Sequence, residues 1–346
     1  MGVLASMRSS GIASALVLAA LVLAGPCSAR AAERIVVPIK QTVLSDGEIR
    51  YSIPVVIAGG DPIDAMLDTG STGLRVLQGT VAEALYSVSD RTSLYRYGLG
   101  VRLHGIIARA VVTVGGAATD APIPLEIVQS VDCADDAPRC PAARVRPEEY
   151  RMGGDGLPNQ GFRAIVGINM GRADAANPLS RIGMHSWLVL LPRPGERTPG
   201  TLIINPDAND RNGFALFHTD DLMGRLPGAG GYHDAIAGCL VGDEGRRRIC
   251  GPTLLDTGAP GLHLSSGEPS DLSGWHPGSR AQIAFTSDQG TELDVRLTED
   301  ADRTSRITTE LKPHEPRTRI AAGTLPYFSL AVLYDGEHSM IGLKPR

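Results

Sequence analysis

Short runs of aliphatic and β-branched residues recur along the chain, and Gly, Pro, Asp or Asn bounds each run. No long stretch repeats its apolar positions with the 3.6-residue period of an amphipathic helix. Short apolar runs between turn residues are typical of β-strands, so the pattern predicts a mainly β fold. We expect short helices only at residues 80–86 and 170–174, and strands at residues 35–39, 51–57, 106–114, 123–128, 164–168, 187–191, 201–204, 281–285 and 328–333.

The first 31 residues differ from this pattern. Arg8 precedes a continuous apolar stretch at residues 12–25, and small residues at Ala29 and Ala31 follow it. This order is typical of an export signal cleaved after Ala31, and the apolar stretch is short for a bilayer span. We therefore expect residues 1–31 to be a signal peptide. The rest of the chain is then exported, periplasmic or secreted, with no stable membrane span after cleavage.

A polar, turn-rich segment at residues 205–213 divides the remainder. Such a segment is typical of a linker between two compact parts. It predicts an N-terminal β lobe at residues 32–207 and a C-terminal β lobe at residues 208–346.

Composition narrows the classes of function. Of the 346 residues, 42% are hydrophobic and 21% are charged, which is typical of a globular protein rather than a disordered one. The formal charge is −5, and losing Arg8 and Arg30 with the signal makes it −7. Nucleic-acid binding is not expected, because such proteins usually carry a basic excess or a basic stripe.

Four cysteines remain after signal cleavage: Cys133, Cys140, Cys239 and Cys250. Four cysteines allow three pairings. The local pairing, Cys133–Cys140 with Cys239–Cys250, closes two short loops and suits an oxidising compartment. A zinc site is the alternative, but the chain has no CxxC, HxxxH or HExxH motif. We expect no metal and no cofactor.

The sequence Asp-Thr-Gly occurs twice, each time directly after an apolar run. The first copy places Asp68 before Thr69 and Gly70, and the second places Asp256, 188 residues later, before Thr257 and Gly258. Glycine permits a sharp turn and a close approach of the backbone, and a threonine hydroxyl can tie one turn to the other.

Two such turns facing each other would bring the two carboxyl groups together. Carboxylates about 3 Å apart cannot both ionise, so they share one proton. The ionised member can then take a proton from water, while the protonated member donates to a carbonyl oxygen. The repeated motif therefore predicts amide hydrolysis by general acid–base catalysis.

With these motifs the chain resembles the pepsin-like aspartic proteases. A Tyr97-Gly98-Leu99-Gly100 sequence, followed by Gly105, is similar to the hairpin that covers the substrate in that family. The resemblance implies a bilobal fold with two six-stranded-barrel-type lobes and a central cleft. It also extends to residues 51–76, 112–116, 162–168, 200–207, 320–323 and 327–345.

The resemblance implies a role for each matching residue. Asp68 and Asp256 would be the catalytic pair, Thr69 and Thr257 would join the two turns, and Ser71 would bond Asp68. Gly70 and Gly258 would complete the turns, while Tyr97, Gly98 and Leu99 would lie over the bound peptide. The substrate would be an extended polypeptide, and the protein would act as a monomer because one chain holds both aspartates.

Three positions depart from the family pattern. Arg75 stands where many members have a tryptophan that supports the flap tyrosine, and Leu99 replaces a common threonine. Ala259 lacks the hydroxyl usually found after the second Asp-Thr-Gly. Loss of a hydrogen-bond donor makes the ionised form of a carboxylate less stable. We therefore expect a pH optimum less acid than is usual for the family.

An alternative function is a non-catalytic or very narrow-specificity binding protein on the same fold. Retention of both aspartates and of Tyr97 favours an enzyme, whereas Arg75 and Ala259 favour the alternative. Serine hydrolase and nucleotide-binding functions are not expected, because the chain has neither a GxSxG motif nor a phosphate-binding loop.

Overall fold

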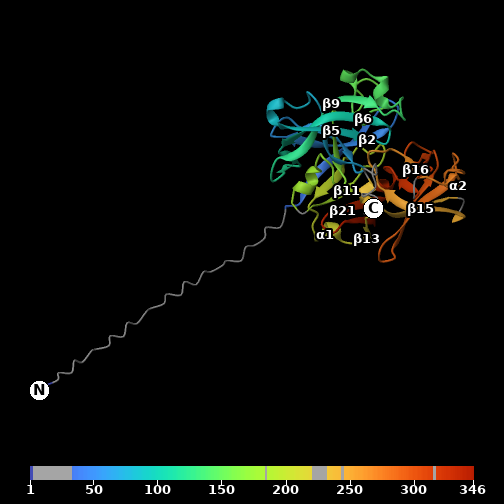
Figure 1. Cartoon of the computed structure of the whole chain (residues 1–346). Coiled ribbons are helices and arrows are strands. Elements are labelled where there is room, and N and C mark those ends of the chain that lie inside the picture. Colours follow the sequence, from blue (N-terminus) through green and yellow to red (C-terminus); the bar gives the residue numbers. More distant parts are fainter. Residues whose placement is uncertain (3–32, 184, 220–231, 243–244, 315–316) are drawn as a thin grey trace. The chain divides into compact units, whose positions relative to one another are not determined.

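The structure is a computed structural model that describes residues 1–2, 33–183, 185–219, 232–242, 245–314 and 317–346 (Figure 1). The chain divides into two compact units, Met1–Ala31 and Ala32–Arg346. The predicted signal peptide lies almost wholly outside the described residues. Within the described residues, no helix is both long and apolar enough to cross a membrane.

The second unit is built mainly of β-strands, as the sequence pattern predicted. Its larger sheet has 15 strands in the order β13-β22-β21-β11-β12-β1-β2-β3-β10-β4-β9-β6-β5, and off this path β7 pairs with β2 and β8 pairs with β7. These strands are β1 (Ile35–Val43), β2 (Ile49–Ile57), β3 (Ile63–Asp68), β4 (Thr72–Leu77), β5 (Ser87–Arg96), β6 (Val101–Ala110), β7 (Val112–Val114), β8 (Ala117–Ala118), β9 (Ile123–Cys133), β10 (Ala164–Ile168), β11 (Ser186–Leu190), β12 (Gly200–Ile204), β13 (Ala215–His218), β21 (Leu330–Asp335) and β22 (Met340–Pro345).

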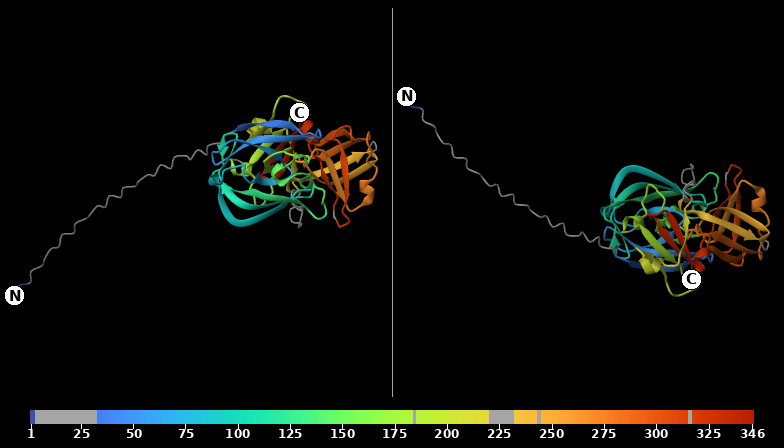
Figure 2. Two further views of the ribbon diagram at one scale, coloured as in Figure 1. Left: turned by 90° about the horizontal axis from the view of Figure 1, so that it is seen from above. Right: turned by 90° about the horizontal axis from the view of Figure 1, so that it is seen from below.

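The smaller sheet has seven strands in the order β18-β17-β14-β15-β20-β16-β19. In both views of Figure 2 the blue to green strands lie on one side of the unit and the orange strands on the other. The strands of this sheet are β14 (Ile236–Gly242), β15 (Arg247–Leu254), β16 (Leu262–Ser266), β17 (Arg280–Thr286), β18 (Glu292–Thr298), β19 (Ile307–Leu311) and β20 (Arg319–Ala321).

Two open sheets replace the expected pair of six-stranded-barrel-type lobes, and no barrel closes within the described strands. The reason lies in the last strands of the chain. β21 is buried along nearly its whole length and pairs with β11 on one side and β22 on the other. The C-terminal hairpin and β13 therefore extend the larger sheet, although all three belong to residues 208–346.

All nine predicted strands overlap observed ones, but neither of the two predicted helices is an α-helix. Residues 80–86 contain only a 3₁₀ turn, η1 (Glu83–Leu85). Residues 170–174 are not helical: the Asn169 side chain accepts from the Gly171 N–H, and Asp234 accepts from the Met170 N–H.

The linker predicted at residues 205–213 contains one turn of helix, α1 (Ala208–Arg211). Asp207 caps its N-terminus, and Asp210 returns a bond to the Asp207 N–H. Asp210 also pairs with Arg34 at 2.6 Å, which ties this turn to the start of the described chain. A second helical turn, α2 (Pro269–Leu272), precedes β17.

Both disulfides follow the local pairing. Cys133, at the end of β9, bonds Cys140, and Cys239 in β14 bonds Cys250, its direct cross-strand partner in β15. Each bond closes a short loop and so restricts the unfolded chain.

Candidate active site

The two Asp-Thr-Gly turns occupy equivalent places in the two sheets. In the larger sheet, β3 leads into the first turn and β4 leads out of it, and β10 lies between them, parallel to β3 and antiparallel to β4. In the smaller sheet, β20 lies in the same way between β15 and β16. A parallel partner then flanks each outgoing strand, β9 beside β4 and β19 beside β16. The repeated motif is therefore a repeated arrangement of four strands.

Reciprocal hydrogen bonds join the two turns. The Thr257 hydroxyl accepts from the Thr69 N–H at 3.0 Å and donates to the Leu67 carbonyl at 2.7 Å. The Thr69 hydroxyl accepts from the Thr257 N–H at 2.9 Å and donates to the Leu255 carbonyl at 2.7 Å. Both threonines are almost fully buried, so these four bonds are shielded from water and hold the turns in one relative position.

Two buried tyrosines extend the hydrogen-bond network of this junction, a role that the sequence analysis did not predict for them. The Tyr327 hydroxyl donates toward Thr69 Oγ1 at 3.0 Å and shares a 2.5 Å hydrogen bond with the Tyr334 hydroxyl. The Tyr334 ring stacks on Trp187 with centroids 5.8 Å apart. The signal available in the sequence was weak: a tyrosine in an apolar run is expected to be buried, and a buried tyrosine hydroxyl usually finds a polar partner.

The junction brings Asp68 and Asp256 side by side, close enough for the charge of Asp68 to act on the Asp256 carboxyl group. The glycines make this approach possible. A Cβ atom on Gly70 would lie 2.4 Å from the Asp256 carboxyl, and one on Gly258 would lie 2.6 Å from Asp68 Oδ1. Any side chain at either position would therefore force the carboxyl groups apart.

The two carboxyl groups have unequal hydrogen-bond donors. Asp68 accepts from the Ser71 hydroxyl at 2.5 Å and from the Gly70 N–H at 2.9 Å. Asp256 accepts from the Gly258 N–H at 2.8 Å, and within the described chain no hydroxyl donates to it, since Ala259 stands where Ser71 would correspond. Burial, and then the neighbouring charge of Asp68, raises the pKa of Asp256 to about 7. Asp256 is therefore the member that holds the shared proton in acid and near-neutral solution.

The hairpin predicted around residues 97–100 connects β5 to β6. The Tyr97 N–H donates to the Val101 carbonyl, and the Gly100 N–H donates to the Tyr97 carbonyl. Gly98 and Leu99 form the exposed tip, where Leu99 is 67% exposed. Tyr97, unlike the exposed tip, is packed inside the protein. Its ring joins an apolar cluster with Tyr150, and its hydroxyl is buried without a hydrogen-bond partner in the described structure.

Tyr95, two residues before Tyr97, is the hairpin tyrosine that interacts with Ser71 and with both carboxyl groups. Burial raises the pKa of its hydroxyl, and the Arg75 charge opposes this rise. Alternation along a strand places residues 95 and 97 on one face, which was the signal available in the sequence. The predicted site residues thus lie together around the two turns, except for the exposed hairpin tip, and Tyr95 is an addition to them.

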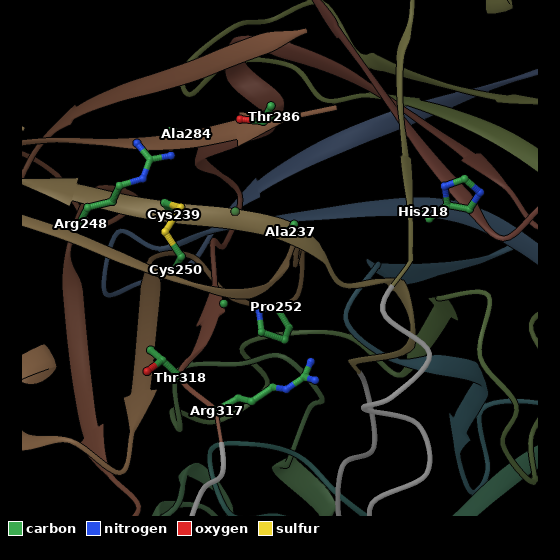
Figure 3. Close-up of a pocket in the computed structure, with 12 residues that line it drawn as sticks. His218, Ala237, Cys239, Arg248, Cys250, Pro252, Ala284, Thr286, Arg317 and Thr318 are labelled. Atoms are coloured by element: carbon green, nitrogen blue, oxygen red, sulfur yellow. A yellow bond between two sulfur atoms is a disulfide. The ribbon is translucent and has the colours of Figure 1, made fainter. Parts of the chain in front are cut away.

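Other features of the molecule lie apart from these residues. Figure 3 shows a pocket lined in part by the Cys239–Cys250 disulfide, Pro252 and Arg248 of the smaller sheet. Its volume is about 560 Å³. None of the aspartates, threonines or tyrosines of the candidate site lines it. In the part of the chain that the structure describes, no group of three or more His, Cys, Asp or Glu residues is arranged to hold a metal ion.

Comparisons with protein-family models and with curated proteins find no match to this chain.

Proposed function

We propose that this protein is an aspartic endopeptidase of the pepsin-like type, which hydrolyses peptide bonds of extended polypeptides. The observation that carries the proposal is the paired carboxyl groups of Asp68 and Asp256, held on two equivalent turns by reciprocal threonine bonds. The same proposal includes a bilobal fold with the site between two lobes, each lobe built around one Asp-Thr-Gly turn. One chain supplies both aspartates, so a monomer is sufficient.

The two carboxyl groups accept different numbers of hydrogen bonds, and this difference assigns the base and acid roles in the proposed reaction. Ionised Asp68, stabilised by Ser71 and Gly70, removes a proton from a water molecule that attacks the scissile carbonyl carbon. Protonated Asp256 donates its proton to the carbonyl oxygen, which gives a neutral tetrahedral diol. The proton held by Asp68 then passes to the leaving nitrogen as the C–N bond breaks, and a diol hydroxyl returns its proton to Asp256.

The proposed setting is an exported one, periplasmic or secreted, after removal of residues 1–31. Two disulfides in the remaining unit support it, because disulfides persist in oxidising compartments.

A second candidate is a non-catalytic or very narrow-specificity binding protein. The absence of a hydroxyl donor to Asp256 at position 259 favours it, because catalysis by a carboxyl pair depends on matched protonation. Both candidates predict an intact cleft, so binding alone does not separate them.

Cleavage of a denatured protein between pH 2.5 and 7.5 tests the proposal, with a statine-type transition-state inhibitor as the control. We expect inhibitor-sensitive release of new amino termini. Inhibitor binding measured by calorimetry without any cleavage would favour the second candidate, and neither binding nor cleavage by folded protein would contradict both.

The pH dependence provides a separate prediction. Activity needs Asp256 protonated and its partner ionised, so we expect it to fall as pH rises through about 7, the pKa of Asp256. Ala259→Ser places a hydroxyl where it can donate to ionised Asp256, and one such bond lowers the pKa by roughly 1 unit. The descending limb of the kcat/KM profile should therefore move to lower pH.

Ala259→Gly is the matched control, because it changes the same position without adding a donor. Its descending limb should stay within about 0.3 unit of the wild-type position. Equal limbs in the serine and glycine variants would contradict the assignment of the shared proton to Asp256.

A further inference from the structure

One buried arginine contacts three separate parts of the larger sheet. The Arg75 side chain is 2% exposed, and its Nη1 donates to the Thr72 carbonyl at 2.9 Å, directly after the first Asp-Thr-Gly turn. Its Nε lies 3.0 Å from Glu126 Oε2 in β9. Its guanidinium carbon lies 3.5 Å from the centre of the Tyr95 ring in β5. Arg75 therefore links the end of the first Asp-Thr-Gly turn to β9 and to β5, the first strand of the hairpin.

The sheet is shaped to admit the Glu126 carboxylate. Arg75 and Glu126 are register partners in the parallel pair β4–β9. On the other side of β9, the pairing with β6 shifts between His104 and Gly105. A Cβ atom on Gly105 would lie 3.1 Å from Glu126 Oε1 and 2.4 Å from the Ile127 carbonyl. A larger residue at position 105 would thus compete with the carboxylate for space.

Tyr95 carries the contact onward to the carboxyl pair. Its ring meets the Tyr97 ring edge-on, with centroids 4.9 Å apart. Its hydroxyl interacts with Ser71, the residue that donates to Asp68. The Arg75 guanidinium also interacts electrostatically with Asp68. The contacts from Glu126 to Arg75 and from Arg75 to the Tyr95 ring therefore extend toward Ser71 and Asp68.

Stability alone does not account for this arrangement. A buried ion pair loses hydration that its own attraction often fails to recover, and apolar residues of similar volume are frequently as stable. A cation held 3.5 Å over an aromatic ring does fix the position of that ring. The contacts of Arg75 are therefore best explained by what they hold in place.

We propose that Arg75, charge-balanced by Glu126, is a positioning residue that clamps β5, the first strand of the hairpin, to the Asp68 turn by holding the Tyr95 side chain next to Ser71. The clamp rests on the proposed function, because its consequence for the reaction is to keep the hairpin over a bound peptide. Its structural consequence, a hairpin held down through Tyr95, can be measured without any substrate.

The test uses amide hydrogen exchange across residues 87–100 and kcat/KM to compare six variants: four single changes, the double variant Arg75→Met/Tyr95→Leu, and Arg75→Lys. Arg75→Met removes the cation, Tyr95→Leu removes the ring, and Tyr95→Phe keeps the ring while removing the hydroxyl. Arg50→Met is the matched control: Arg50 is 4% exposed and pairs with Glu48 at 2.6 Å, but it contacts neither the flap nor the turn.

We expect Arg75→Met and Tyr95→Leu each to speed exchange in the hairpin by about tenfold or more, as loss of a desolvated cation–π contact implies. The double variant should show little further increase, because both changes remove the same contact. Tyr95→Phe should exchange like the wild type. Arg50→Met should lower the midpoint of urea unfolding yet leave exchange in residues 87–100, and kcat/KM, unchanged.

In an active enzyme, Arg75→Met should also lower kcat/KM by about tenfold, and Arg75→Lys should recover part of it. Hairpin exchange that rises equally in Arg75→Met and Arg50→Met, or additively in the double variant, would overturn the clamp. If the wild type has no protease activity, the proposed function fails, while the exchange comparison still decides whether the clamp exists.

Discussion

Asparagine at either Asp68 or Asp256 is expected to reduce cleavage of a denatured protein by about 10³-fold, the range that general acid–base catalysis supplies. Asp68→Asn removes the base that accepts the proton from water, and Asp256→Asn removes the acid that donates to the carbonyl oxygen. Neither variant alters side-chain volume, so both should fold. The measurement is the initial rate of amino-terminus release at pH 5, near the middle of the expected active range.

Asp234→Asn is the control for this pair of variants. Asp234 is also a buried aspartate, 3% exposed, and burial raises the pKa of its carboxyl to about 8, so an amide replaces a neutral group. We expect its rate to stay within about threefold of the wild type, because it lies outside the carboxyl pair. A similar loss of activity in all three variants would point to general disruption rather than to catalysis.

Stability should move in the opposite direction for Asp256→Asn. The pKa of Asp256 is raised from 3.8 to about 7 in the folded protein, so the folded state binds more protons than the unfolded state within this window. The free energy of unfolding therefore decreases as pH rises from about 4 to 7. Asparagine removes that dependence, so the variant should be more stable than the wild type at pH 7.5 while being inactive.

Valine at Thr257 is expected to cause the second large effect, a loss of roughly 2–6 kcal/mol in the free energy of unfolding. The substitution keeps the shape of the side chain but removes the hydroxyl that accepts from the Thr69 N–H and donates to the Leu67 carbonyl. Both backbone groups are then buried without a partner. Each unsatisfied group contributes about 1–3 kcal/mol, and urea unfolding followed by tryptophan fluorescence measures the sum.

Thr257→Ser is the matched control, since it loses a methyl group and keeps the hydroxyl. Its unfolding midpoint should lie between those of the wild type and the valine variant, and closer to the wild type. The double variant Thr69→Val/Thr257→Val should lose less than the sum of the single changes, because the two hydroxyls serve one junction. Equal midpoints for Thr257→Ser and Thr257→Val would show that the junction contributes little.

Local patterns determined much of the secondary structure. Apolar runs bounded by turn residues located most of the strands of the larger sheet, because a buried strand is a short run of consecutive apolar residues and is visible within a few positions of the sequence. The local disulfide pairing followed from short spacing, and both pairs were correct. The expected helix at residues 170–174 was wrong: the segment is irregular, and its Met170 N–H donates to Asp234, 64 residues away. A window of ten residues contains no trace of that acceptor.

The sequence by itself also determined where the candidate chemistry lies. Two Asp-Thr-Gly copies after apolar runs were enough to predict two carboxyl-bearing turns and their threonine bonds. The motif supplies the hydroxyls and N–H groups of those bonds, and the residue directly before each copy, Leu67 or Leu255, supplies the carbonyl. The allocation of strands to sheets was beyond it. Expected barrels gave way to two open sheets because β21 and β22 pair with β11 and β13, and pairing partners far apart in sequence leave no local signal.

Only the tertiary structure decided the roles of Arg75, Tyr95 and Tyr327. In the sequence, Arg75 is a departure from a family pattern and Tyr95 is an unremarked neighbour of the flap tyrosine. Burial next to Glu126 makes Arg75 half of an ion pair. Its guanidinium also lies 3.5 Å from the centre of the Tyr95 ring, although β9 and β6 separate β4 from β5 in the order of the sheet. Such roles depend on which charged side chains are buried next to one another. Folding decides this by bringing together strands that are distant in the chain.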